Sequence, residues 1–235
     1  MVQSLYQPPC PSRPRPALRL GSLLGGLSYA LDMTEGQPAG HCIRCYWICT
    51  RIGIAPGLSS QEYEDLYFTL LLKDLGFGSN AARICALYLA DDIRFKRDLK
   101  VIDGNLTAAL RLHFTKNRLE AGLSERLRTT VNILRNGGQI SCELIETHCH
   151  HGADIVAKMR FSEVLEDAIR SLDEHWNGSG KQEGLAGVKI PRLSNIALMA
   201  QVTDIFHSDQ GPEAALAEVV GRAGSWFDPM VVSAF

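Results

Sequence analysis

Apolar residues recur every three or four positions along most of the chain after Leu18, which is the spacing of one face of an α-helix. No turn dipeptide flanked by alternating apolar and polar residues is present, so the sequence contains no hairpin signal. The pattern therefore predicts an all-α fold. The predicted helical segments are 20–33, 41–53, 59–76, 80–92, 107–114, 124–136, 140–159, 162–176, 193–208 and 212–224.

Local signals place some boundaries. Ser59 and Ser60 followed by Glu62 predict a helix N-terminus, because a serine and a glutamate at this spacing can cap each other's backbone N–H groups. Residues 1–17 contain five prolines and cannot sustain a helix or a strand ladder. The sequence thus predicts a flexible Pro-rich tail over 1–17 and one helical domain over 18–235.

Composition excludes several classes of protein. Of the 235 residues, 46% are hydrophobic and 21% are charged, as in ordinary globular domains, and the net charge of −2 gives no basic field for nucleic acid. No apolar run is long enough for a membrane span, and the N-terminus lacks a secretory signal. We therefore expect a cytoplasmic protein with no membrane and no direct nucleic-acid partner.

The cysteines fit reduced thiols. There are seven of them, an odd number, in a chain without a secretion signal. Cys42, Cys45 and Cys49 share one helical face, and we expect them to pack in the core as small hydrophobic residues.

The segment 174–191, EHWNGSGKQEGLAGVKIP, resembles the signature of the HD-GYP phosphodiesterases, HHERWDGxGYPxGLxGxxIP. The last twelve residues, GSWFDPMVVSAF, resemble the segment GxxFDPxxVxAF that closes many of these domains. The resemblance implies an HD-domain-like helical bundle. The matching residues of the signature are Trp176, Gly178, Gly180, Gly184, Leu185, Gly187, Ile190 and Pro191.

Members of this family bind divalent metals with histidines and aspartates that project from facing helices. By the resemblance, His41, Asp74 and His148 fall on ligand positions, and Asp173 replaces a ligand histidine with a carboxylate. Three or four such ligands would hold one metal of the Mn, Fe, Ni or Zn type, or none.

Other ligand positions have changed. By the resemblance, Gln37 replaces a glutamate, Leu172 a histidine and Gln201 an aspartate, while Asp204 falls on a second, usually structural aspartate. These replacements remove metal donors.

The HD dyad itself reads Lys73-Asp74. A lysine ammonium has no lone pair for a metal, so Lys73 would instead pair with Asp74 and stand in for the metal charge. The alternative is that Asp74 faces His41 and His148 around an ion. Asp74 and Lys73 are the candidate catalytic residues, and Ser179 and Lys181 in the glycine-rich loop are the candidate contacts for a substrate phosphate.

Two functions follow from the resemblance. The lost ligands favour a catalytically silent HD-GYP-like signalling domain that binds a ligand or a protein partner, such as those attached to helix-turn-helix regulators, whose output domain would follow Phe235. The alternative is a metal-dependent phosphodiesterase or phosphohydrolase acting on cyclic di-GMP or another nucleotide. The expected partners are a nucleotide or cyclic dinucleotide, a protein partner and a second copy of the chain.

Overall fold

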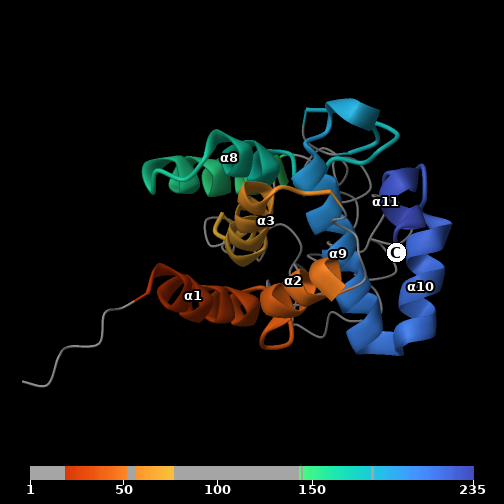
Figure 1. Ribbon diagram of the computed structural model, residues 1–235, viewed down its shortest axis with the longest axis horizontal. Coiled ribbons are helices and arrows are strands. Elements are labelled where there is room, and N and C mark those ends of the chain that lie inside the picture. The colour runs from red at the N-terminus through yellow and green to blue at the C-terminus, as the bar shows by residue number, and fades with distance from the viewer. Residues whose placement is uncertain (1–18, 52–56, 77–142, 144, 181–182) are drawn as a thin grey trace, which may run out of the picture.

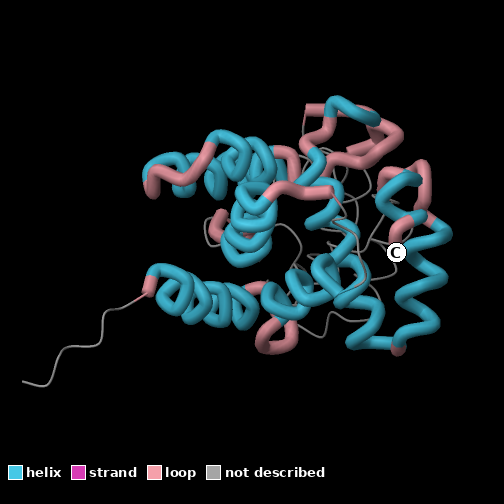
Figure 2. The backbone as a smooth tube through the Cα atoms, viewed as in Figure 1, coloured by secondary structure: helices cyan, strands magenta, loops and turns pink. Residues whose placement is uncertain are grey.

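The computed structural model describes residues 19–51, 57–76, 143, 145–180 and 183–235. In this part of the chain the secondary structure is helical, without strands, and a single β-bridge joins Ala223 to Phe227 (Figure 2). This confirms the predicted all-α class. The tail 1–17 and the predicted helices 80–92, 107–114 and 124–136 lie outside the described residues.

The described helices follow the predicted segments closely. Two departures matter for the site. The segment 162–176 is helical only to Arg170, and the segment 59–76 is helical only to Leu72, so that Lys73 and Asp74 lie in the turn that follows. The helices are α1 Leu20–Thr34, α2 His41–Arg51, α3 Ser60–Leu72, a segment over 145–158, α8 Glu163–Arg170, the short 3₁₀ helix η2 Gly187–Lys189, α9 Arg192–Gln210, α10 Pro212–Gly221 and α11 Pro229–Ser233.

Helix α9 is the central helix of the described part of the chain. It packs against α2, α3, α8 and α10, and Figure 1 shows it running between the α1–α2–α3 side and the α10–α11 side. Every residue from 193 to 205 is buried, including polar Asn195, Gln201 and Asp204. A helix buried on all faces contributes both apolar packing and polar groups to the interior. This is how Asp204 comes to lie in the core.

The start of α3 confirms the predicted cap. The Ser59 hydroxyl accepts a hydrogen bond from the Glu62 backbone N–H at 3.3 Å, and the Ser59 N–H donates to the Glu62 carboxylate at 2.7 Å. Two N–H groups that the helix cannot satisfy internally are thereby paired. The cap fixes where α3 begins. The length of α3 then determines where Lys73 and Asp74 lie.

The thiols of α2 also lie where the pattern predicts. Cys42, Cys45 and Cys49 are fully buried and are free thiols, as is Cys149. Cys45 and Cys49 pack in the core around α9, and Cys42 packs in a second cluster with α1 and α3 residues.

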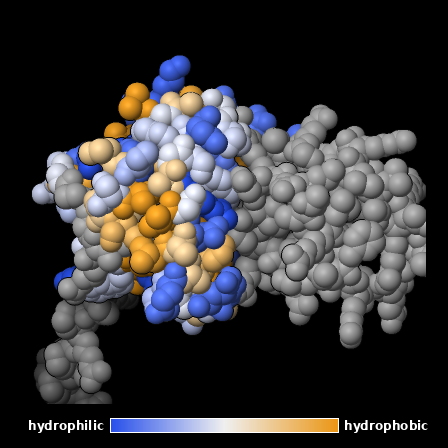
Figure 3. All heavy atoms as spheres, turned by 90° about the vertical axis from the view of Figure 1, so that its right-hand side faces the viewer, coloured by the Kyte–Doolittle hydropathy of each residue, from blue (hydrophilic) through white to orange (hydrophobic). Residues whose placement is uncertain are grey.

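One face of the molecule carries exposed apolar side chains. Figure 3 looks at the side of α10 and α11, where Leu216, Val220 and Met230 are more than half exposed. None of the described helices is both long and apolar enough to cross a membrane.

Candidate functional site

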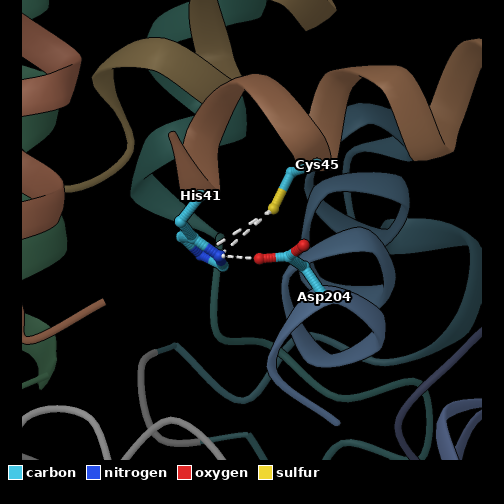
Figure 4. Close-up of side chains that lie close together, drawn as sticks. All are labelled: His41, Cys45 and Asp204. Atoms are coloured by element: carbon cyan, nitrogen blue, oxygen red, sulfur yellow. Dashed lines mark hydrogen bonds and ion pairs between the residues drawn. The ribbon is translucent and has the colours of Figure 1, made fainter. Parts of the chain in front are cut away.

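A buried polar group joins α2 to α9. His41 and Cys45, one helical turn apart on α2, point towards Asp204 of α9 (Figure 4). His41 Nδ1 lies 2.7 Å from Asp204 Oδ2, and the Cys45 sulfur lies 3.7 Å from both ring nitrogens of His41. All three residues are buried. Their potential ligand atoms lie within 4.8 Å of one another, close enough to share one metal ion.

The carboxylate of Asp204 orients the His41 ring. An ionised carboxylate only accepts hydrogen bonds, so His41 Nδ1 carries the ring proton and donates a hydrogen bond to Asp204. In the neutral ring the lone pair is then on Nε2. The same carboxylate accepts two hydrogen bonds from Arg44, at 2.8 and 2.9 Å. Burial alone would raise the pKa of Asp204, but the hydrogen bonds from His41 and Arg44 outweigh it and lower the pKa. Asp204 is therefore an anion.

A second group lies between α1, α2 and the turn after α3. It consists of Asp32, Cys42 and Asp74, which are buried and have ligand atoms within 4.8 Å of one another. The Cys42 N–H donates to Asp32 Oδ1 at 3.2 Å, and the Cys42 thiol donates to Asp74 Oδ2 at 3.7 Å. This group places two carboxylates and a thiol in the interior.

Lys73 neutralises part of this charge. Its side chain is completely buried, and its ammonium donates to Asp74 Oδ2 in an ion pair, which confirms the predicted pairing. Burial by itself lowers the pKa of Lys73, but the charge and hydrogen bond of Asp74 and the effects of Cys42 and Cys45 together outweigh burial and leave the pKa above its ordinary value. Burial raises the pKa of the Cys42 and Cys45 thiols, and Lys73 opposes that rise at both of them. Lys73 is thus an ammonium whose field reaches both groups.

The other two predicted metal ligands, His148 and Asp173, fall outside the two groups. His148 belongs to the helical segment 145–158, whose backbone approaches the turn after α3 at Gly76, and the thiol of neighbouring Cys149 lies 3.8 Å from Asp173. Neither of the two ligand groups among the described residues contains His148 or Asp173. The set predicted from the sequence, His41, Asp74, His148 and Asp173, is therefore divided, with His41 in one group and Asp74 in the other.

The glycine-rich loop is anchored against the C-terminal region. The Trp176 N–H donates to the carbonyl of Trp226 at 3.0 Å, and the His175 ring stacks on the Trp226 indole with ring centroids 4.1 Å apart. His175 Nδ1 is hydrogen-bonded to the Ser179 hydroxyl at 3.2 Å, and Ser179 is exposed. Its predicted companion Lys181 lies outside the described residues. The role of both as phosphate contacts stays a prediction.

The donor atoms of the two groups fit a divalent metal in type. Imidazole nitrogen, thiolate sulfur and carboxylate oxygen are all ligands of zinc and iron, and a histidine held by a carboxylate through one ring nitrogen is the usual arrangement of a metal-binding histidine. The charges fit less well. Asp204 already pairs with Arg44, and Asp74 with Lys73. Among the described residues, Lys73 is the group that most directly opposes a metal at Asp74.

Four residues of these groups were missed as site residues by the sequence analysis. Asp204 was assigned a structural role, Cys42 and Cys45 were assigned to core packing, and Asp32 was not considered as a ligand. The four-residue spacing of His41 and Cys45 on one helix was a usable signal. The approach of Asp204 to His41 was not, since 163 positions separate them.

Comparison with known proteins identifies relatives for nearly the whole chain. A family model described as "HD domain" matches residues 110–231, more than half of the chain. The chain is 49% identical over 213 residues to the 3'3'-cGAMP-specific phosphodiesterase 3 of Vibrio cholerae, an alignment covering 91% of this chain and 46% of that protein. A probable cyclic di-GMP phosphodiesterase of the same organism is 29% identical over 121 residues, covering 44% of this chain and 27% of that protein.

A solved structure supports the same relationship. The crystal structure of a cyclic GMP-AMP specific phosphodiesterase from V. cholerae is similar with a TM-score of 0.67 and 43% sequence identity, covering 92% of this chain and 47% of that one. The chain thus spans about half the length of the first of these curated relatives and about a quarter of the second. The all-α fold, the HD-like signature and the family match agree. The chain belongs to the HD-domain family.

Proposed function

We propose that this chain acts in the hydrolysis of a 3'3'-linked cyclic dinucleotide, as the HD domain of a phosphodiesterase. The observation that carries the proposal is the 49% identity, over 91% of this chain, to a 3'3'-cGAMP-specific phosphodiesterase. The sequence alone favoured a catalytically silent domain. The similarity supports the phosphodiesterase alternative better, because it extends over almost the whole of this chain.

The buried groups suit this chemistry in kind. Phosphodiester hydrolysis needs positive charge beside the phosphoryl oxygens and an activated water, and a bound divalent metal supplies both. The residues that would hold it are His41, Cys45 and Asp204 in the first group, or Asp32, Cys42 and Asp74 in the second. Lys73 carries positive charge at the same place. A metal of the Mn, Fe, Ni or Zn type is compatible with these donors.

A second candidate function is favoured by one observation. Lys73 and Asp74 are both fully buried and paired with each other, an arrangement that closes off the dyad position. A domain with this arrangement would keep the fold to bind a cyclic dinucleotide or a protein partner without cleaving it.

An assay with 3'3'-cGAMP and cyclic di-GMP tests the proposal. The purified chain is incubated with Mn²⁺ and each dinucleotide, linear products are separated by chromatography, and binding is followed by calorimetry. We expect hydrolysis of 3'3'-cGAMP that falls by about 100-fold or more in Asp74→Asn, because the variant loses a charge in the buried dyad. Asp154→Asn, which makes the same change at an exposed carboxylate on the segment 145–158, should keep the activity.

The other outcomes are equally decisive. Binding of 3'3'-cGAMP without any product would support the silent domain. Activity that is unchanged in Asp74→Asn would remove the dyad from the mechanism. If the chain neither binds nor cleaves either dinucleotide, a role in cyclic dinucleotide turnover is rejected.

A further inference from the structure

The turn after α3 holds a lysine ammonium in a fully buried position. Lys73 and Asp74 are adjacent in sequence, neither side chain is exposed, and the two are paired. Burying an ammonium without an anion costs far more free energy than an ordinary side-chain contact returns, so each member of the pair depends on the other. The buried placement of the Lys73 ammonium is therefore stabilised by its ion pair with Asp74 as well as by packing.

Each of the two buried ligand groups is paired with a cationic side chain, which is buried in the case of Lys73 and partly exposed in the case of Arg44. Arg44 donates two hydrogen bonds to Asp204, and Lys73 donates to Asp74. The Cys42 thiol donates to the same carboxylate oxygen of Asp74 as the Lys73 ammonium, so the ammonium lies beside the ligand atoms of the second group. A divalent metal entering beside Asp74 would meet this ammonium at short range in a medium that screens charge poorly.

We propose that the Lys73 ammonium holds the cation position of this site and competes with divalent metal for the carboxylate of Asp74. The inference deepens the proposed function, on which its relevance to catalysis rests, by naming what controls metal at the same site. A metal can take Asp74 only if the ammonium withdraws.

The inference is tested by Mn²⁺ binding to the purified chain and four variants. Mn²⁺ prefers oxygen and nitrogen donors to thiols, so it reports on Asp74 more than on the cysteines. Free Mn²⁺ is measured by electron paramagnetic resonance during titration. Lys73→His supplies a ligand in place of the cation, and Lys73→Met removes the cation with little change in shape. We expect both to bind Mn²⁺ about tenfold or more tightly than the unmodified chain.

Two variants serve as controls. Lys73→Arg keeps the positive charge, and Lys158→Met makes the same neutralisation at an exposed lysine. Both should bind Mn²⁺ as weakly as the unmodified chain. Thermal unfolding followed by circular dichroism checks that each protein is folded. A Lys73 variant that folds only when Mn²⁺ is added would also support the inference, because the metal then supplies the missing charge.

Three results would overturn the inference. The first is that the unmodified chain binds Mn²⁺ as tightly as the Lys73 variants. The second is that neither Lys73→His nor Lys73→Met binds Mn²⁺ more tightly than the unmodified chain. The third is that Lys73→His and Lys73→Met both stay unfolded when Mn²⁺ is present. Hydrolysis of 3'3'-cGAMP is measured on the same proteins. If Mn²⁺ affinity rises as expected and no protein cleaves the dinucleotide, the proposed function fails while the inference about Lys73 stands.

Discussion

At the scale of single residues, the interior of this domain is a set of buried polar groups whose charges are offset locally. Asp204 is paired with Arg44 and His41, and Asp74 with Lys73. Beside them lie thiols that burial keeps protonated. The thiols give this interior a measurable dependence on pH.

The α2 thiols should destabilise the fold at alkaline pH. Burial raises the pKa of Cys49 from its ordinary value of 9.0 to about 12, so above pH 9 the unfolded chain releases a proton that the folded chain retains. A raised folded pKa means stability that is fully present below pH 9 and is lost as the pH rises towards 12. The loss approaches about 1.4 kcal/mol per pH unit for this one group.

Urea unfolding at pH 7, 8, 9 and 10 measures this effect. The free energy of unfolding should fall more steeply above pH 9 in the unmodified chain than in Cys49→Ala, which lacks the titrating group. The alanine variant is less stable at every pH because it leaves a cavity, so the comparison concerns the slopes. Parallel curves for the two proteins would contradict the burial of a neutral thiol at this position.

At the scale of elements, the close approach of two helices determines the surroundings of the Lys73–Asp74 turn. Gly76 ends this turn against the backbone of the segment 145–158. A methyl group on Gly76 would lie 2.8 Å from the carbonyl carbon of His148 and 2.9 Å from the backbone nitrogen of Gly152. Only a residue without a side chain permits this contact, because both neighbours are backbone atoms that cannot rotate away.

Replacing Gly76 with alanine should therefore separate these two elements. We expect Gly76→Ala to lower the free energy of unfolding by about 3 kcal/mol, the upper end of the usual cost of overpacking. Gly26→Ala is the matched control, because its new methyl group has no atom within 4 Å and Gly26 lies inside helix α1. The control should be neutral or stabilising by about 0.5–1 kcal/mol. If Gly76→Ala and the unmodified chain have the same free energy of unfolding in chemical denaturation, the turn at Gly76 does not approach the segment 145–158 this closely.

At the scale of the whole molecule, α9 links the polar centre to both sides of the bundle. Its buried residues contact α2, α3, α8 and α10, so the His41–Asp204 contact and the core share one central helix. The charges at this centre are offset by side chains of the chain itself. The fold should accordingly need no metal to be stable.

Chelation tests that consequence. The unfolding temperature of the purified chain should be the same with and without excess EDTA, because Lys73 already pairs with Asp74 and Arg44 with Asp204. Lys73→His provides the contrast, since Mn²⁺ should raise its unfolding temperature and EDTA should reverse the rise. A marked loss of stability of the unmodified chain in EDTA would instead indicate a structural metal.

Contacts between residues that are close together in the chain could be predicted from the sequence, whereas contacts between distant residues could not. The cap at Ser59 and Glu62 and the shared helical face of Cys42 and Cys45 were predicted correctly, because each is decided within one or two helical turns. The pairing of Lys73 with Asp74 was one of two alternatives left open, and the structure shows this one. The contact between His41 and Asp204 was not, because nothing in either local segment specifies the other.

The sequence by itself determined the helical class, the cap of α3, the free and buried thiols and the resemblance to the HD family. These follow from periodicity, short-range spacing and a long motif, all of which are local or can be recognised without coordinates. Only the tertiary structure decided that His41 joins Cys45 and Asp204 while Asp74 joins Asp32 and Cys42. Such groupings depend on how α1, α2 and α9 cross, and the crossing of helices is set by the packing of many side chains together.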